Sequence, residues 1–169
     1  MRRQLSRWTR AGRLHQLRRG LYALAPPFRK LIPHPFAVAN RLVRGSYVSG
    51  LSVLAHAHLI PEYVAEVTSA TAGRPQIRQT ALGRFSFRHI KTDMLYGYEL
   101  MDLGGGQQAF VATPEKALLD LIYLHPGGDA SVYIEELRLD LDALDLEALD
   151  RLAEIAARPK LLRAARRIR

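Results

Sequence analysis

The chain has 169 residues, 48% of them hydrophobic, and it carries a formal net charge of +9 with no cysteine. This length fits one ordinary domain or a small module joined to a domain of about 120 residues, and the apolar content excludes general disorder. The absence of cysteine excludes disulfide bonds and thiolate metal sites, and no apolar run reaches the roughly 18 residues of a membrane span. We therefore expect a soluble, cytoplasmic protein that does not enter the membrane.

The charges fall into blocks along the chain. Eleven Lys and Arg residues precede the first acidic residue, Glu62, and the last twelve residues hold six basic residues and no acidic one. Between these blocks, residues 62–157 hold sixteen acidic residues and eight basic ones. Blocks of one sign repel themselves and are typical of proteins that bind a polyanion, so nucleic acid is the first candidate partner. A solvated basic face without a partner is the alternative.

The N-terminal segment has the pattern of a partial winged helix, which we assign to residues 1–25. Residues 2–11 are predicted to form a short helix with Leu5 and Trp8 on one side and its arginines on another, ended by Gly12. In residues 13–24, two apolar segments flank a basic turn that contains Gly20, which predicts a β-hairpin. In a winged helix such a helix enters the major groove, and the hairpin, or wing, contacts phosphate.

A proline-rich linker, residues 26–35, separates this module from the second domain, residues 36–169. We expect two helices at residues 36–43 and 49–58, the second capped by Ser49. Short strands follow at residues 64–71, 76–82, 85–90, 98–103 and 108–111. Thr113 and Pro114 mark the start of a helix to about residue 124, and three more helices are expected at 132–139, 146–157 and 160–168. The fold class is therefore α+β, with a small, mostly antiparallel sheet and a helical C-terminal third.

Six stretches taken together give the chain a family resemblance. They are Leu17-Arg-Arg-Gly-Leu-Tyr-Ala-Leu24, Pro35-Phe-Ala-Val-Ala-Asn-Arg-Leu42, Ser46-Tyr-Val-Ser-Gly-Leu-Ser52, Leu59-Ile-Pro-Glu62, Val67-Thr-Ser-Ala-Thr71 and Ala112-Thr-Pro-Glu-Lys-Ala-Leu-Leu-Asp120. In this order and spacing they resemble the AbiEi family of antitoxins from bacterial abortive-infection toxin–antitoxin systems, which act in phage defence. The resemblance implies a winged helix that represses the promoter of its own operon and a second domain that counters a nucleotidyltransferase-like toxin.

The resemblance also implies which residues contact DNA. It places the DNA-contacting helix at Arg2, Arg3, Ser6, Arg7 and Arg10, and the wing at Arg13, Arg18 and Arg19. The chain departs from the family pattern at Met1, because a winged helix normally has two helices ahead of the recognition helix. We therefore expect a truncated module that binds DNA electrostatically, either because the start codon is set too far downstream or because of a deliberate or natural truncation.

Two further charged surfaces stand out near the C-terminus. Arg163, Arg166 and Arg167 share one helical face, which indicates a second phosphate contact or a partner surface; a solvated last turn is the alternative. The acidic residues between 135 and 154 alternate with leucines, as amphipathic helices require. A sharper hypothesis is that this acidic face, which charge reversal at Asp140, Asp142 and Asp145 would test, meets a basic surface, either the N-terminal module or the nucleic-acid groove of a toxin.

The sequence gives little support to catalysis. The glycines at 104–106 lack a following Lys-Ser or Lys-Thr, so they predict a hairpin turn and not a phosphate loop. Glu99, Asp102, Glu115 and Lys116 faintly resemble a nuclease set, but the helix start explains the last two. We expect no enzymatic activity, cofactor or metal. The alternative function is a stand-alone DNA-binding regulator without a toxin partner.

Overall fold

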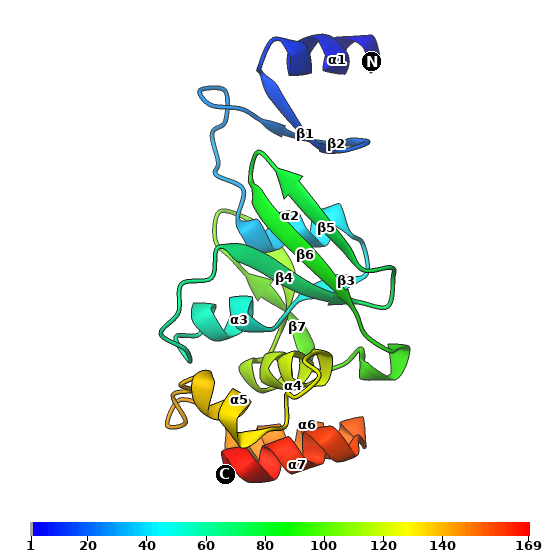
Figure 1. Cartoon of the computed structure of the whole chain (residues 1–169). Helices are drawn as coiled ribbons and strands as arrows, with labels where there is room; N and C mark the ends of the chain where they lie inside the picture. Colours follow the sequence, from blue (N-terminus) through cyan, green and yellow to red (C-terminus); the bar gives the residue numbers. More distant parts are fainter. Residues whose placement is uncertain (1) are drawn as a thin grey trace.

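The computed structural model describes residues 2–169 (Figure 1). Met1, where the truncated module is expected to begin, lies outside the described residues, and so does the side chain of Arg2. The fold is α+β, as the sequence predicts, and its elements follow in chain order. They are α1 (Arg2–Arg10), β1 (Leu14–Arg18), β2 (Leu21–Leu24), α2 (Pro35–Leu42), β3 (Ser46–Val48), α3 (Leu51–His56), β4 (Glu66–Thr71), β5 (Gln76–Thr80), β6 (Gly83–His89), the 3-10 turn η1 (Thr92–Met94), β7 (Tyr98–Asp102), β8 (Gln108–Ala112), α4 (Pro114–Leu124), α5 (Ser131–Glu136), α6 (Leu146–Ala156) and α7 (Pro159–Ile168).

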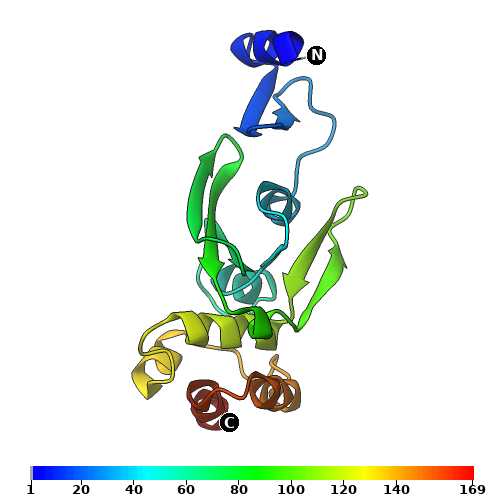
Figure 2. The same ribbon diagram turned by 90° about the vertical axis from the view of Figure 1, so that its right-hand side faces the viewer.

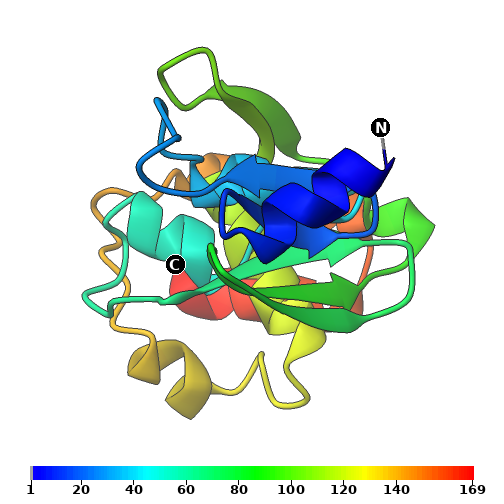
Figure 3. The same cartoon turned by 90° about the horizontal axis from the view of Figure 1, so that it is seen from above.

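The predicted N-terminal helix and hairpin are both present, and they lie together at one end of the molecule (Figure 1; Figure 3, looking down on α1). Strands β1 and β2 pair antiparallel, with Leu14 opposite Leu24, and form a sheet of their own. Gly20 takes the tight turn with φ +79°, a backbone conformation that favours glycine. The linker then descends to α2.

The remaining six strands form one sheet in the order β5-β6-β4-β3-β8-β7. The pairs β4–β6 and β3–β8 are parallel and the other three are antiparallel, so the sheet is mixed. Figure 2 shows that the sheet curves and that α2 lies between its two arms. Helix α4 closes the lower side of the sheet, and α6 and α7 pack beneath α4 (Figures 1 and 2).

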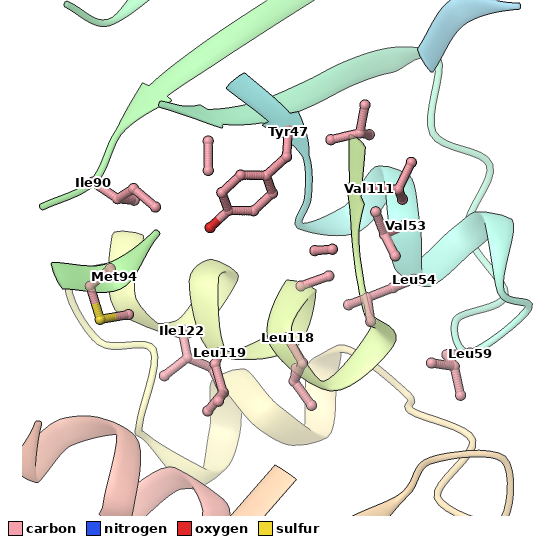
Figure 4. Packing of buried hydrophobic residues seen from close by; sticks show 14 of the residues in the cluster. Tyr47, Val53, Leu54, Leu59, Ile90, Met94, Val111, Leu118, Leu119 and Ile122 are labelled. Atoms are coloured by element: carbon pink, nitrogen blue, oxygen red, sulfur yellow. The ribbon is translucent and has the colours of Figure 1, made fainter. Parts of the chain in front are cut away.

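The hydrophobic core lies between the sheet, α3 and α4, and continues down to α6 and α7. Figure 4 shows Tyr47 pointing from β3 towards α4, with Leu118 and Ile122 of α4 nearby. Every buried member of this core comes from Phe36 or a later residue, while Leu17 and Leu21 of the hairpin pack on it from outside. The second domain therefore contains its own core.

Of two helix starts that the sequence predicts, one is present in the structure and the other is not. The Thr113 side chain accepts a hydrogen bond from the backbone nitrogen of Lys116 at 3.3 Å, with Pro114 in the first turn, so that prediction is confirmed. The prediction that Ser49 caps a helix is wrong, because Gly50 occupies the cap position with φ +63° and α3 is shorter than expected. The Ser49 hydroxyl instead donates to the buried carboxylate of Asp120 at 2.7 Å, and a charged acceptor gives the stronger hydrogen bond.

Within residues 2–169, no helix has both the length and the apolar character needed to cross a membrane.

Candidate nucleic-acid interface

The side chains of α1 that are predicted to contact DNA, and that the structure describes, reach solvent. Arg3, Ser6, Arg7 and Arg10 are all exposed. The opposite side of the helix holds Leu5 and Trp8, which are half-buried. The backbone nitrogen of Arg13 donates to the carbonyl of Trp8 at 2.9 Å and so ties the end of the helix to the hairpin. This arrangement leaves the cationic side of α1 free for an anionic partner.

The three predicted wing residues have different environments. Arg13 and Arg19 are exposed, and the Arg13 guanidinium lies 5.7 Å from the ring centre of Phe28. Arg18 turns towards α2, where its Nη2 and Nε donate to the carbonyl of Arg41 at 3.0 and 3.3 Å. Its Nη1 donates to the carbonyl of Arg19 at 3.2 Å. Arg18 therefore joins the hairpin to the second domain, whereas Arg13 and Arg19 stay available to phosphate.

The C-terminal arginines lie on α7, at the end of the molecule opposite α1 (Figure 1). Arg163 forms an ion pair with Asp129 at 2.7 Å, and Arg167 donates to the carbonyl of the same residue. Hydrogen bonding from Arg163 lowers the pKa of Asp129, and this outweighs the opposing effect of burial. Arg166 is exposed. The structure therefore does not bring this set together with the N-terminal arginines.

The acidic segment lies at the same end as α7. Asp140, Asp142 and Asp145 precede α6, and Asp145 caps that helix by accepting from the backbone nitrogen of Ala148 at 2.8 Å. Asp140 accepts from the backbone nitrogen of Asp142 at 3.2 Å. Since the N-terminal module stands at the other end, this segment does not meet it within one chain (Figure 1). A contact with a toxin stays a prediction.

A buried polar network was missed by the reading of the sequence. Lys116 and Asp120 of α4 form an ion pair whose side chains are 0% and 1% exposed. Tyr47 accepts from Lys116 Nζ at 2.9 Å and donates to Asp120 Oδ2 at 2.9 Å, and Ser49 donates to the same oxygen. The signal was present, because a Lys and an Asp four residues apart share one face of a helix. The network joins β3 to α4.

Burial dominates the ionisation of this network. It lowers the pKa of Lys116 and raises the pKa of Asp120, since taking either charge out of water disfavours it. The pKa of Tyr47 is also raised, by burial first and by the Asp120 charge second. The ion pair and the hydrogen bonds to Asp120 act in the opposite direction and favour the charged forms.

The residues of the faint nuclease set are divided between two environments. Glu99 and Asp102 are exposed on β7. Glu115 and Lys116 are buried in α4, where Glu115 accepts from the backbone nitrogen of Asp145 at 3.2 Å. In the part of the chain that the structure describes, no group of three or more His, Asp or Glu side chains is placed to hold a metal ion.

Comparison with known proteins gives no relative: neither the models of known protein families nor the curated protein sequences contain a match to this chain.

Proposed function

We propose that the protein is the antitoxin and DNA-binding autorepressor of a bacterial toxin–antitoxin operon, and that it has no enzymatic activity. The observation that carries the DNA-binding part is the basic helix α1 beside a hairpin, with Arg3, Arg7 and Arg10 exposed at one end of the molecule. The antitoxin part is supported by the resemblance of the six sequence stretches to AbiEi proteins.

The charge distribution supports a phosphate-binding role for this end. All basic residues before Glu62 belong to α1, the hairpin, the linker, α2 and the turn after it, and none of these segments supplies an acidic neighbour. Each phosphate that such a surface neutralises releases counterions from DNA, so binding weakens as salt rises. Phosphate contacts position a protein on DNA, and base contacts add the sequence preference.

The separate core of the second domain supports the assignment of two functions to two different parts of the chain. Since the core starts at Phe36, the surfaces that would meet a toxin are built without the N-terminal module. We propose that this domain, from Phe36 onward, counters a nucleotidyltransferase-like toxin, and that the N-terminal module acts on the promoter. Countering the toxin and repressing the promoter then depend on different residues.

Growth rescue tests the proposal. The gene next to this one is expressed in bacteria from an inducible promoter, and the 169-residue chain is supplied in trans. A variant with Arg7→Ala and Arg10→Ala is supplied in parallel, together with a reporter driven by the operon promoter. We expect both proteins to restore growth and only the unmodified chain to repress the reporter.

Three outcomes contradict the proposal in different places. If the product of the neighbouring gene is toxic and neither protein restores growth, the antitoxin role is excluded and only the role of a regulator remains. If both proteins repress the reporter equally, α1 does not contact the promoter through Arg7 and Arg10. A harmless neighbour combined with repression favours the stand-alone regulator.

A further inference from the structure

A hollow of about 310 Å³, lined by apolar and polar side chains, opens on the face of the sheet that does not carry α2. Side chains alternate between the two faces of a strand, and Val67 and Phe85 point to the α2 side, where they border a separate hollow with Phe36. The alternate positions, Thr68 and Ser86, line the first hollow. Its far wall comes from α4 and α5.

Three hydroxyl side chains form a row across the floor of this hollow. Thr68 of β4 lies opposite Ser86 of β6, and their hydroxyl oxygens are 3.2 Å apart. Ser49 follows on the other side of β4, where its backbone nitrogen donates to the carbonyl of Thr68 at 3.0 Å. The hollow therefore has hydrogen-bonding groups along the whole width of three neighbouring strands.

The next row has a small residue between two large ones. Ala70 of β4 lies opposite Tyr47 on one side and opposite Arg88 on the other. Ala70, which is buried, and Arg88, which is exposed, both line the hollow. Leu121 and Leu124 of α4 give the hollow an apolar wall, and His125 is stacked on Tyr133 with ring centres 4.0 Å apart.

The charges around the hollow favour an anion at Arg88. Arg88 is exposed and forms no salt bridge with any described residue. Glu66 forms an ion pair with Arg84. Burial raises the pKa of Glu66, but the hydrogen bonds from Ser86 and Arg84 lower it by more, so the net pKa is lowered and the carboxylate is ionised. Asp120 is balanced by Lys116. Arg84 and Arg88 both act on the one carboxylate of Glu66, so one positive charge is left in excess beside the hollow, and Arg88 is the arginine that lines it.

Ser49 adds a second requirement for a ligand. Its hydroxyl hydrogen is used for Asp120 Oδ2, at 2.7 Å, so its oxygen has only lone pairs to offer to a ligand. A group that donates a hydrogen bond, such as a hydroxyl, satisfies those lone pairs. The hollow thus presents an acceptor at Ser49 and a cation at Arg88.

We propose that this hollow is a binding site for a small organic anion: a molecule with a phosphate or carboxylate group held by Arg88 and a hydroxyl group that donates to Ser49. Its volume lies at the lower end of the range for small-molecule sites, about 300 to 1,000 Å³. A few placed polar groups beside an apolar wall are the usual composition of such sites. The proposal is independent of the DNA-binding and antitoxin roles.

Nuclear magnetic resonance titration of the full chain tests this site. Ribose 5-phosphate and gluconate are the probes, since both are polyhydroxylated and they differ in the anionic group; neutral ribose is the control. We expect saturable shifts of the backbone amides of Ser49, Thr68 and Ser86 with a Kd of about 1 mM or tighter for at least one anion. Ribose should produce no saturable shift.

Matched arginine variants separate a built site from general attraction of anions. Arg88→Gln should weaken binding at least tenfold, which corresponds to about 1.4 kcal/mol. Arg78→Gln should leave it unchanged, because Arg78 is opposite Phe85 on β6 and so belongs to the other face of the sheet. Absence of saturable shifts with both anions overturns the proposal, and so does an equal loss of affinity in the two variants.

Discussion

Lys116 and Asp120 are buried, and they are held by each other and by two hydroxyl groups. A carboxylate and an ammonium group that are 1% and 0% exposed lose their hydration, and the hydrogen bonds from Tyr47 and Ser49 offset part of that cost. Removing one partner leaves the other charge buried and unpaired. The integrity of the β3–α4 contact therefore depends on both residues.

We predict that Asp120→Ala lowers the free energy of unfolding by about 3 to 5 kcal/mol, because Lys116 is then buried without its partner. Urea denaturation followed by circular dichroism measures this. Glu62→Gln is the control, since the Glu62–Arg138 pair is largely exposed and its loss should change stability far less. Equal losses in the two variants would contradict the role assigned to burial.

Neighbouring glycines after α4 offer a second test at the same scale. A Cβ added at Gly128 would lie 2.3 Å from the carbonyl oxygen of Ile122, whereas one at Gly127 would meet nothing within 4 Å. Gly128→Ala should therefore destabilise the protein by about 1 to 3 kcal/mol through overpacking, and Gly127→Ala by no more than about 0.5 kcal/mol. Thermal unfolding of both variants decides the point, and a ranking in the opposite order would refute it.

At the scale of elements, the sequence predicts those whose signals are local. The helix that begins after Thr113 was predicted from its cap and its proline, and the turn at Gly104–Gly106 from its glycines, all three of which have positive φ. Strand β3, Ser46–Val48, was not predicted, because three residues that are all buried show no alternation between polar and apolar positions.

Strand pairing depends on contacts that no local signal carries. β4 and β5 are separated by a short turn, which favours an antiparallel hairpin. In the structure β6 lies between them and pairs in parallel with β4, with Val67 opposite Phe85. The burial of Phe85 and Phe87 against the rest of the core is a tertiary effect, and it decides which strand lies next to β4. For the same reason the site at Ser49, Thr68 and Arg88 could not be predicted from the sequence.

Asp129 fixes α7 to the loop after α4, and this contact should depend on pH. The hydrogen bond from Arg163 lowers the pKa of Asp129, so the stabilisation is present above the ordinary aspartate pKa of about 4 and is lost as the pH falls through the lowered value. We predict that Asp129→Asn is less stable than the unmodified protein at neutral pH and that the difference shrinks in acid. Urea unfolding at neutral and acidic pH measures it; a difference that is the same at both would contradict the ion pair as its cause.

At the scale of the whole molecule, the two ends have separate roles in the proposed function. The N-terminal module is joined to the second domain by the linker, by the contact of Leu17 and Leu21 with the core and by the hydrogen bonds from Arg18 to Arg41. The backbone nitrogen of His34 also donates to the Gln107 side chain at 2.8 Å. These contacts orient the module, while the core of the second domain is complete without it.

We therefore predict that a chain of residues 34–169, which keeps His34 as the cap of α2, folds cooperatively. Its unfolding in urea should remain a single transition, because no buried member of the core has been removed. A broad transition, or near-ultraviolet circular dichroism without fixed side-chain signals, would show that the hairpin is part of the core.

The salt dependence of binding to the operon promoter tests the central claim most directly. Binding is measured by fluorescence anisotropy at several salt concentrations for the unmodified chain, for Arg7→Ala with Arg10→Ala, and for Arg163→Ala with Arg166→Ala. The N-terminal pair should reduce the slope of log K against log salt by up to about 2, close to one unit per lost phosphate contact, and the C-terminal pair should leave it unchanged. An unchanged slope in the N-terminal variant, or a reduction only in the C-terminal one, would contradict the assignment of the DNA contact to α1.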